Sequence, residues 1–403
     1  MNGKNFSSLE QKGIKSEGLY VKNRPFYAEG DGTKLEVRYA PKWREINTLA
    51  DYFSLLKDIH DKNEVRLKKQ EKECGSLFLY RGQGDLNFDY SPSILRDKKK
   101  IWREHILQKE FHRYFFERLD NFKTVFDEEV LMQHYGAGSR CLDLLENPLM
   151  ALWAACEFDS NVKLKDSFGE VSFWCLDYED DNLKSYDSST VSVCTNTAIC
   201  EKNFSLGDLN IEYRKEHPTD LEDFIYLKDI LRRTVIARPK YNNIRFTHQL
   251  NCFAIMNLNK LIDPYGNFQK KFGISVEKFS DYILNASVIN RGKGVEYEKP
   301  NVDRLREGFH TLSANFSELS LWDLQFEKMI PNDSPFVDTF DLYRYMYNDS
   351  ETENERVPVY AVVPPGSKEN LLKELKYANI TNATVYPDMS EISKEMLKNF
   401  GIS

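Results

Sequence analysis

The stretch from Leu131 to Phe158, LMQHYGAGSRCLDLLENPLMALWAACEF, constrains the fold of this chain more than any other segment. Gly136 and Gly138 predict a loop, and SRCLDLL after them predicts a short strand. Asn147 is a favoured helix N-cap, and Pro148 stands at the first helical position, where proline is tolerated best. The helix that follows is apolar almost all round, so we expect it to be buried on several sides.

Elements of both kinds surround this stretch. Apolar residues at three- and four-residue steps predict helices from Trp43 to about Cys74 and over 101–122. The run SLFLYRGQGD predicts a strand that ends at Gly82 and Gly84. Further strands are predicted at GEVSFWCLDY, IRFTHQLNCFAIM, VPVYAVVPP and ATVYP, with a helix at NLLKELKYAN between the last two. Such a mixture favours an α+β fold with a mixed central sheet and flanking helices.

Composition excludes several classes of protein. The net charge of −8 gives no general attraction to nucleic acid, although it allows a local basic groove. The seven cysteines form no Cys-x-x-Cys and no zinc-finger spacing, so we interpret them as reduced, mostly buried thiols and expect no metal site. No apolar run is long enough to span a membrane, and the N-terminus lacks a secretory signal. We therefore expect a cytoplasmic protein without a membrane partner.

Several blocks resemble the bacterial FRG domain family, which takes its name from an aromatic-Arg-Gly tripeptide. The blocks are YRGQ at 80–83, QHYG at 133–136 and SRCLDLLENPLMALWAACEF at 139–158. IRFTHQLNCF resembles a further family segment through Arg245, Gln249 and Phe253, and LLKELKYANITNATVYPDMSEIS resembles its closing unit. The chain departs from the family pattern at Gly138-Ser139, Leu144-Leu145 and Asn251.

This resemblance implies a domain organisation. An irregular arm is expected over 1–40 and the main part of the FRG domain over 41–256. A mostly helical insertion is expected over 257–352, and a C-terminal strand-helix-strand unit over 353–403 completes the domain.

The order of these blocks is also similar to ADP-ribosyltransferases of the Arg–Ser–Glu type. That likeness implies an ADP-ribosyltransferase-like core that consumes NAD as its substrate. It further implies catalytic roles for Gln249, Asp143 and Glu146. The implied cofactor-binding residues are Tyr80, Arg81, Gly82, Gln83, His134, Tyr135 and Arg140.

Each role has a physical reason. Arg81, beside Gly82, offers a planar charged fork to a pyrophosphate, and Arg140 offers a second contact. His134 suits a ribose hydroxyl, and the ring of Tyr135 suits nicotinamide. Gln249 occupies the place of a catalytic carboxylate but cannot act as a general base, which leaves Asp143 and Glu146 as the carboxylate candidates. Structural alternatives remain: Arg140 and Asp143 can pair with each other, and Gln249 can be a buried amide.

Three functions are compatible with these patterns. The first is a mono-ADP-ribosyltransferase-like effector or toxin in bacterial conflict or phage defence, which modifies a protein or nucleic acid. The second is a non-catalytic module that senses a nucleotide at the same site. In either case the insertion at 257–352 offers a surface for a regulatory or antitoxin partner. The third is an interaction protein without a small-molecule site.

Overall fold

The structure is a computed structural model of the 403-residue chain. The residues that it describes are 28–29, 36–37, 42–86, 88, 90–119, 124–157, 162–178, 183–209, 227, 230–231, 234–240, 251–263, 270, 275–276, 324–329, 347 and 359–387.

The main element is an eight-stranded sheet with strand order β3-β13-β6-β4-β5-β10-β9-β7. Only the two edge strands, β3 and β7, pair in parallel with their neighbours, and the inner pairs are antiparallel. In spatial order the strands are Lys42–Glu45, Val359–Val363, Gly169–Asp177, Ser76–Gln83, Cys141–Leu145, Asn251–Met256, Thr234–Arg238 and Leu183–Ser185. The expected α+β fold with a mixed sheet is therefore confirmed.

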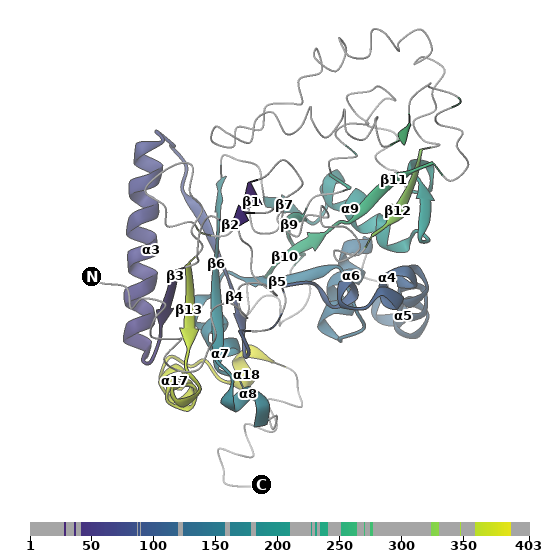
Figure 1. Ribbon diagram of the computed structural model, residues 1–403. Coiled ribbons are helices and arrows are strands. Elements are labelled where there is room, and N and C mark those ends of the chain that lie inside the picture. Colours follow the sequence, from purple (N-terminus) through teal and green to yellow (C-terminus); the bar gives the residue numbers. More distant parts are fainter. Residues whose placement is uncertain are drawn as a thin grey trace.

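The sheet divides into two halves between β4 and β5. The strand β4 pairs with β6 along all eight of its residues but with β5 only at Tyr80 and Leu145. The strand β5 instead pairs with β10 over five residues. In Figure 1 the strands β3, β13, β6 and β4 run up and down the picture, whereas β5 and β10 run across it. The ladder is thus nearly interrupted at its centre.

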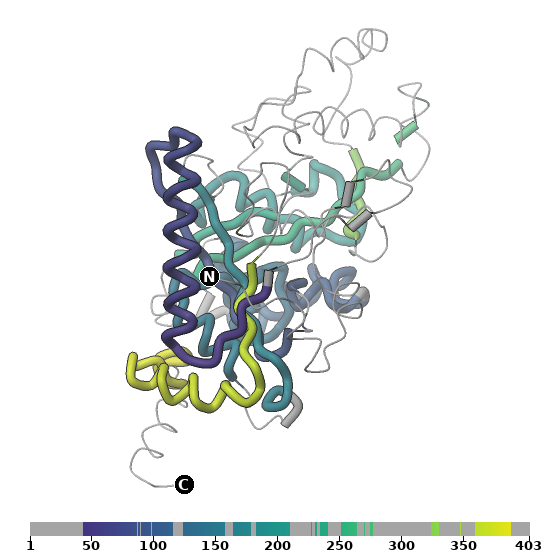
Figure 2. The backbone as a smooth tube through the Cα atoms, turned by 60° about the vertical axis from the view of Figure 1, so that its left-hand side comes forward, coloured from purple at the N-terminus to yellow at the C-terminus, as the bar shows by residue number. Residues whose placement is uncertain are grey.

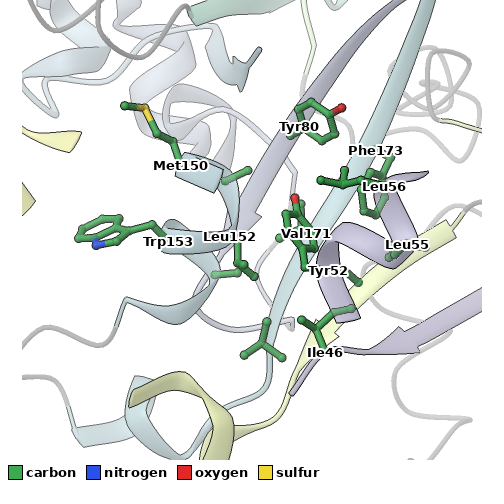
Figure 3. Packing of buried hydrophobic residues seen from close by; sticks show 14 of the residues in the cluster. Ile46, Tyr52, Leu55, Leu56, Tyr80, Met150, Leu152, Trp153, Val171 and Phe173 are labelled. Atoms are coloured by element: carbon green, nitrogen blue, oxygen red, sulfur yellow. The ribbon is translucent and has the colours of Figure 1, made fainter. Parts of the chain in front are cut away.

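Three helices cover one face of the first half. They are α3 (Leu49–Lys69), α7 (Pro148–Cys156) and α17 (Lys368–Tyr377). Figure 2 shows α3 along one side of this half, with the C-terminal strand and helix returning beside its start. Beneath these helices lies an apolar core that includes Tyr52, Tyr80 and Phe173, drawn in Figure 3. This core makes the first half of the sheet a stable frame for the residues of β4.

In the second half of the sheet, two other helices cover the same face that α3, α7 and α17 cover in the first half. The helices α6 (Val125–His134) and α9 (Ser189–Ile199) pack over β5, β9 and β10 around Phe126 and Phe253. The opposite face of the whole sheet is covered by a third core, to which the segment from Leu86 to Ile101 contributes. That segment contains η1 (Ser93–Arg96) and leads into α4 (Lys98–Trp102) and α5 (Glu104–Leu119).

Smaller elements complete the described part. A three-stranded sheet joins β11 (Asn259–Ile262), β12 (Gln325–Lys328) and β8 (Asn203–Ser205). A two-stranded ladder pairs β1 (Ala28–Glu29) with β2 (Glu36–Val37) inside the arm that we expected to be irregular. The remaining short elements are α8 (Val162–Asp166), η3 (Leu206–Asp208), η7 (Pro365–Ser367) and α18 (Asn382–Val385).

Several predicted elements differ in the structure. The first predicted helix begins at Leu49, and the residues before it form the edge strand β3. The capping box of Thr48 and Asp51 fixes this start, because both side chains bond the backbone of the first turn. The segment ATVYP is mostly the helix α18, not a strand. The insertion at 257–352 was predicted to be mostly helical, but its longer described elements are the strands β11 and β12, so the prediction is wrong for these segments. Most of the remaining insertion lies outside the described residues.

Candidate functional site

Arg81 lies where the two halves of the sheet separate. Directly before it, Tyr80 makes the only pairing of β4 with β5. Beyond this point the Arg81 side chain bridges the strands, since its Nη1 donates a hydrogen bond to the backbone oxygen of Asp143 at 2.9 Å. A guanidinium group therefore replaces the ladder hydrogen bonds at the division of the sheet.

The Arg81 guanidinium keeps most of its hydrogen-bonding capacity. Arginine has five N–H donors, and among the described residues this group makes a single hydrogen bond. Its Nε is buried and has no hydrogen-bond partner there. Burial lowers the pKa of Arg81, and the nearby charge of Asp143 opposes that shift. An anionic ligand at this position would receive hydrogen bonds that the described residues leave unmade.

Asp143 is positioned by the helix α6. Gln133, in the last turn of α6, donates a hydrogen bond from its amide to the Asp143 carboxylate. Strand alternation places the Asp143 side chain on the face of Leu145, whereas Arg81 comes from the opposite face. The two side chains thus approach the division of the sheet from its two sides. The hydrogen bond between them joins the Arg81 guanidinium to the backbone oxygen of Asp143.

Aromatic residues follow at the end of α6. Tyr135 is 48% exposed, and its ring stacks on Phe115 of α5 with centroids 5.9 Å apart. His134 packs edge-on against Tyr135 at 5.2 Å. The chain then turns through Gly136 and Gly138, both at positive φ, where residues with a Cβ are strained. These turns lead the chain from α6 into β5, and Gln133, directly before His134, is the residue of α6 that bonds Asp143.

Arg140 belongs to a different environment. Its side chain is 1% exposed and forms a bidentate pair with Glu104, with both N–O distances at 2.6 Å. It also bonds Thr197, while its backbone N–H donates to Glu129 at 3.0 Å. The pairing of Arg140 with Asp143 that we considered is wrong in the structure. Because these bonds occupy the Arg140 guanidinium, we assign it a structural role.

The other residues of the YRGQ motif serve packing. Tyr80 is 3% exposed, meets Phe173 edge-on and bonds His60 through its hydroxyl at 3.1 Å. A Cβ on Gly82 would lie 1.8 Å from the backbone oxygen of Ala151 in α7. Gly82 therefore allows a helix, not a ligand, to approach the strand. Gln83 is buried, and its amide lies 3.4 Å from a backbone oxygen of the following turn.

The two remaining catalytic candidates lie apart from Arg81 or outside the described residues. Glu146 accepts hydrogen bonds from Nε and Nη2 of Arg238 at 3.0 and 2.8 Å. Gln249 lies in the segment 241–250, outside the described residues, as do Arg245 and Asp388. Of the predicted residues, the structure joins Arg81 and Asp143 by a direct hydrogen bond, and His134 and Tyr135 directly follow Gln133, the partner of the Asp143 carboxylate.

Sequence reasoning missed the supports of this group. Gln133 was part of the quoted motif but received no role, although its place directly before His134 was a usable signal. Phe115 was interpreted only as a core residue of its helix. Tyr90 and Arg96, which cover the Arg81 side of the sheet, come from an irregular segment without periodicity, so no sequence pattern pointed to them.

The comparison with known proteins adds one finding. A family model of the FRG domain matches residues 76–163, which include β4, α6, β5 and α7. The chain contains an FRG domain. The matched residues of this FRG domain include Arg81, Gln133 and Asp143 together with the helix that packs on Gly82. No curated protein and no solved structure is significantly similar to the chain.

Two further observations concern the described residues only. None of their helices is both long enough and apolar enough to cross a membrane. They contain no group of three or more His, Cys, Asp or Glu side chains that could hold a metal ion.

Proposed function

We propose that the FRG domain binds NAD through its diphosphate at Arg81 and transfers ADP-ribose to a protein or nucleic acid. The observation that carries this proposal is the Arg81 guanidinium, which spans the division of the sheet and has a buried Nε without a partner among the described residues. The similarity of the motif order to ADP-ribosyltransferases of the Arg–Ser–Glu type led to NAD as the ligand.

The chemistry of the transfer sets what the site must provide. The bond between nicotinamide nitrogen and ribose C1′ breaks, and nicotinamide leaves with the electron pair. An acceptor nucleophile then forms a bond to C1′ and loses its proton. Positive charge develops on the ribose during this step, and a nearby carboxylate stabilises it. We assign that role to Asp143, which Gln133 holds in place.

The exposed ring of Tyr135 is the proposed stacking surface for the nicotinamide. Its stacking on Phe115 restrains the ring, and the side chain is 48% exposed. An aromatic ring held in this way binds a flat heterocycle at little cost in side-chain entropy. His134, directly before it, is the proposed hydrogen-bond partner of a ribose hydroxyl.

A second candidate is binding without turnover. It is favoured because both described carboxylate candidates already accept hydrogen bonds within the protein. Asp143 accepts from Gln133, and Glu146 accepts from Arg238. In this case the FRG domain would sense the nucleotide, and the segment 257–352 would pass the signal to a regulatory partner.

Calorimetry with NAD tests the binding step, and chromatography of released nicotinamide tests turnover. We expect Arg81→Gln to weaken NAD binding by at least about tenfold, because a charge-assisted contact to phosphate is lost. Arg113→Gln, an exposed arginine paired only within its own helix, serves as the control and should bind as the wild type does. Equal NAD affinity of Arg81→Gln and wild type, with both variants folded by circular dichroism, would refute the proposal.

The same samples separate the two candidates. If NAD binds and nicotinamide is released, Asp143→Asn should stop the release while it leaves binding within about threefold. If NAD binds and no nicotinamide appears with any acceptor preparation, the sensing function holds instead. Growth arrest of bacteria that express the wild type, but not Asp143→Asn, is the expected result for a toxin.

A further inference from the structure

The segment from Tyr90 to Arg96 covers the face of the sheet from which Arg81 projects. Tyr90 bonds the Glu170 carboxylate through its hydroxyl, and its ring meets Trp174 edge-on at 6.0 Å. Glu170 and Trp174 flank Ser172 on β6, and Ser172 is the direct cross-strand partner of Arg81. Alternate residues of a strand share a face, so Tyr90 lies on the same side of the sheet as Arg81.

The end of this segment is held against the loop that leads into β5. The backbone N–H of Ile94 donates to the oxygen of Ser139 at 3.3 Å, and the N–H of Ser139 donates to the Ser93 hydroxyl at 3.2 Å. The side chains of Ile94 and Leu95 are buried. The short helix η1 is therefore fixed in place, and its last residue, Arg96, has a defined position beside the strand that carries Asp143.

Arg96 itself is exposed and only partly engaged. Its Nε donates to the backbone oxygen of Ser91 at 2.8 Å, which restrains the side chain. Its two terminal nitrogens make no hydrogen bond or ion pair with the residues that the structure describes. Both remain available as a pair of parallel donors, which is the geometry that arginine offers to a phosphate.

The charge of Arg96 acts directly on Arg81. Burial is the main cause that lowers the pKa of Arg81, and the positive charge of Arg96 lowers it further. Asp143, Tyr90 and Glu170 act in the opposite direction. The two positively charged guanidinium groups repel each other. An anion that contacts both would offset this repulsion.

We infer that Arg96 is the second phosphate-binding arm of the Arg81 site, so that the site selects a ligand with two linked phosphates over one with a single phosphate. The inference rests on the proposed function, since it specifies the ligand class of the same site. Arg81, buried on β4, holds one phosphate, and Arg96, at the exposed end of η1, holds the other. Nucleoside diphosphates and dinucleotides share this feature.

Calorimetry with ADP and AMP at one ionic strength tests the inference, because the two ligands differ only by the second phosphate. We expect wild type to bind ADP at least about tenfold more tightly than AMP. Arg96→Gln should remove this preference and leave the AMP affinity within about twofold. Arg96→Lys, which keeps the charge but not the paired donors, should retain part of it. Arg103→Gln, an exposed arginine seven residues further on, should behave as wild type.

The other outcomes of this experiment distinguish failure of the Arg96 inference from failure of the proposed function. If Arg96→Gln keeps the ADP preference, or weakens ADP and AMP equally, Arg96 is not the second arm, and NAD binding at Arg81 can still hold. If wild type binds ADP and AMP equally well and Arg81→Gln binds neither, the site takes a single phosphate. The inference then fails, and the proposed function can still hold. If wild type binds neither ADP, AMP nor NAD, the proposed function fails together with the inference.

Discussion

Glu129 is a buried carboxyl group next to a second one. It lies on α6 and accepts hydrogen bonds from the Ser139 hydroxyl at 2.6 Å and from the Arg140 backbone at 3.0 Å. Its other oxygen has no partner among the residues that the structure describes. Burial raises the pKa of Glu129 to about 7, and the charge of Glu104 contributes to the rise. The side chain therefore changes its charge near neutral pH inside the protein.

The raised pKa predicts a pH-dependent effect of Glu129→Gln. Between about pH 4.5 and 7 the unfolded wild type loses the proton while the folded protein keeps it, so wild-type stability falls as the pH rises. Glutamine does not titrate. The stability of Glu129→Gln relative to wild type should thus increase by up to about 3 kcal/mol from pH 4.5 to 7.5.

Urea unfolding at several pH values measures this change. Glu110→Gln is the control: Glu110 is exposed, and its hydrogen bond with Arg113 lowers its pKa. The relative stability of that variant should therefore not rise over the same range. A constant difference between Glu129→Gln and wild type at all pH values would show that Glu129 has the same pKa in the folded as in the unfolded protein.

At the scale of single residues, the sequence identified the family motifs but did not show which of their residues face the candidate site and which serve packing. The YRGQ motif was recognised, but only Arg81 of its four residues reaches the candidate site. Tyr80 and Gly82 face α7 and α3, because alternate residues of β4 point to opposite faces. Arg140 was assigned to a ligand because its partner, Glu104, lies 36 residues away on the helix α5 and no local pattern connects the two.

At the scale of elements, the contact of α7 with the sheet is unusually close. A Cβ on Gly82 of β4 would lie 1.8 Å from the Ala151 oxygen, and one on Gly169 of β6 would lie 1.9 Å from the Ala155 oxygen. The helix therefore rests on two glycines of adjacent strands. Glycine is needed here because of the distance between backbones, not because of a special φ.

This contact predicts the effect of Gly82→Ala. The added methyl group must move α7 away from β4, and we expect a loss of about 3 kcal/mol in the free energy of unfolding. Gly75→Ala is the matched control, since nothing lies within 4 Å of the Cβ it would add. It should be neutral or slightly stabilising in thermal and urea unfolding. Equal stability of the two variants would contradict the packing role of Gly82.

Strongly patterned elements were predictable and short ones were not. The buried helix α7 was predicted with its Asn147 cap and Pro148, and Asn147 does accept hydrogen bonds from the first turn. The edge strand β3 has four residues, and the apolar periodicity of α3 appeared to continue through it. In ATVYP, five residues fit one helical turn as well as a strand, and the capping box at Thr381 decides for the helix.

At the scale of the whole molecule, a buried charged cluster joins parts that are distant in sequence. Glu104 of α5 accepts from Arg140, before β5, and from Nζ of Lys328 in β12 at 3.1 Å. Lys328 also donates to the Ala198 oxygen at the end of α9 at 3.0 Å. The three-stranded sheet is thereby fixed to the FRG domain. Glu104 and Lys328 are 224 residues apart, so no local pattern could reveal that they pair.

In this cluster the Glu104 carboxylate pairs directly with both cations, which predicts unequal effects of two substitutions. Glu104→Gln leaves Arg140 and Lys328 buried without their carboxylate and should cost about 3–5 kcal/mol. Lys328→Met keeps the Glu104–Arg140 pair and fills a similar volume. Burial already lowers the pKa of Lys328 to about 8, so loss of its charge should change stability by no more than about 1 kcal/mol.

Urea unfolding of both variants at pH 7 measures these effects, and the double variant shows whether they are coupled. Lys328→Met should reduce the loss of stability caused by Glu104→Gln. In the double variant only one buried cation, Arg140, is left without its carboxylate. If Lys328→Met alone is as damaging as Glu104→Gln, the ammonium of β12 is essential to the attachment of the small sheet. In that case the cluster must be regarded as a triad in which each charge is required, and not as an arginine–glutamate pair with a tolerated lysine.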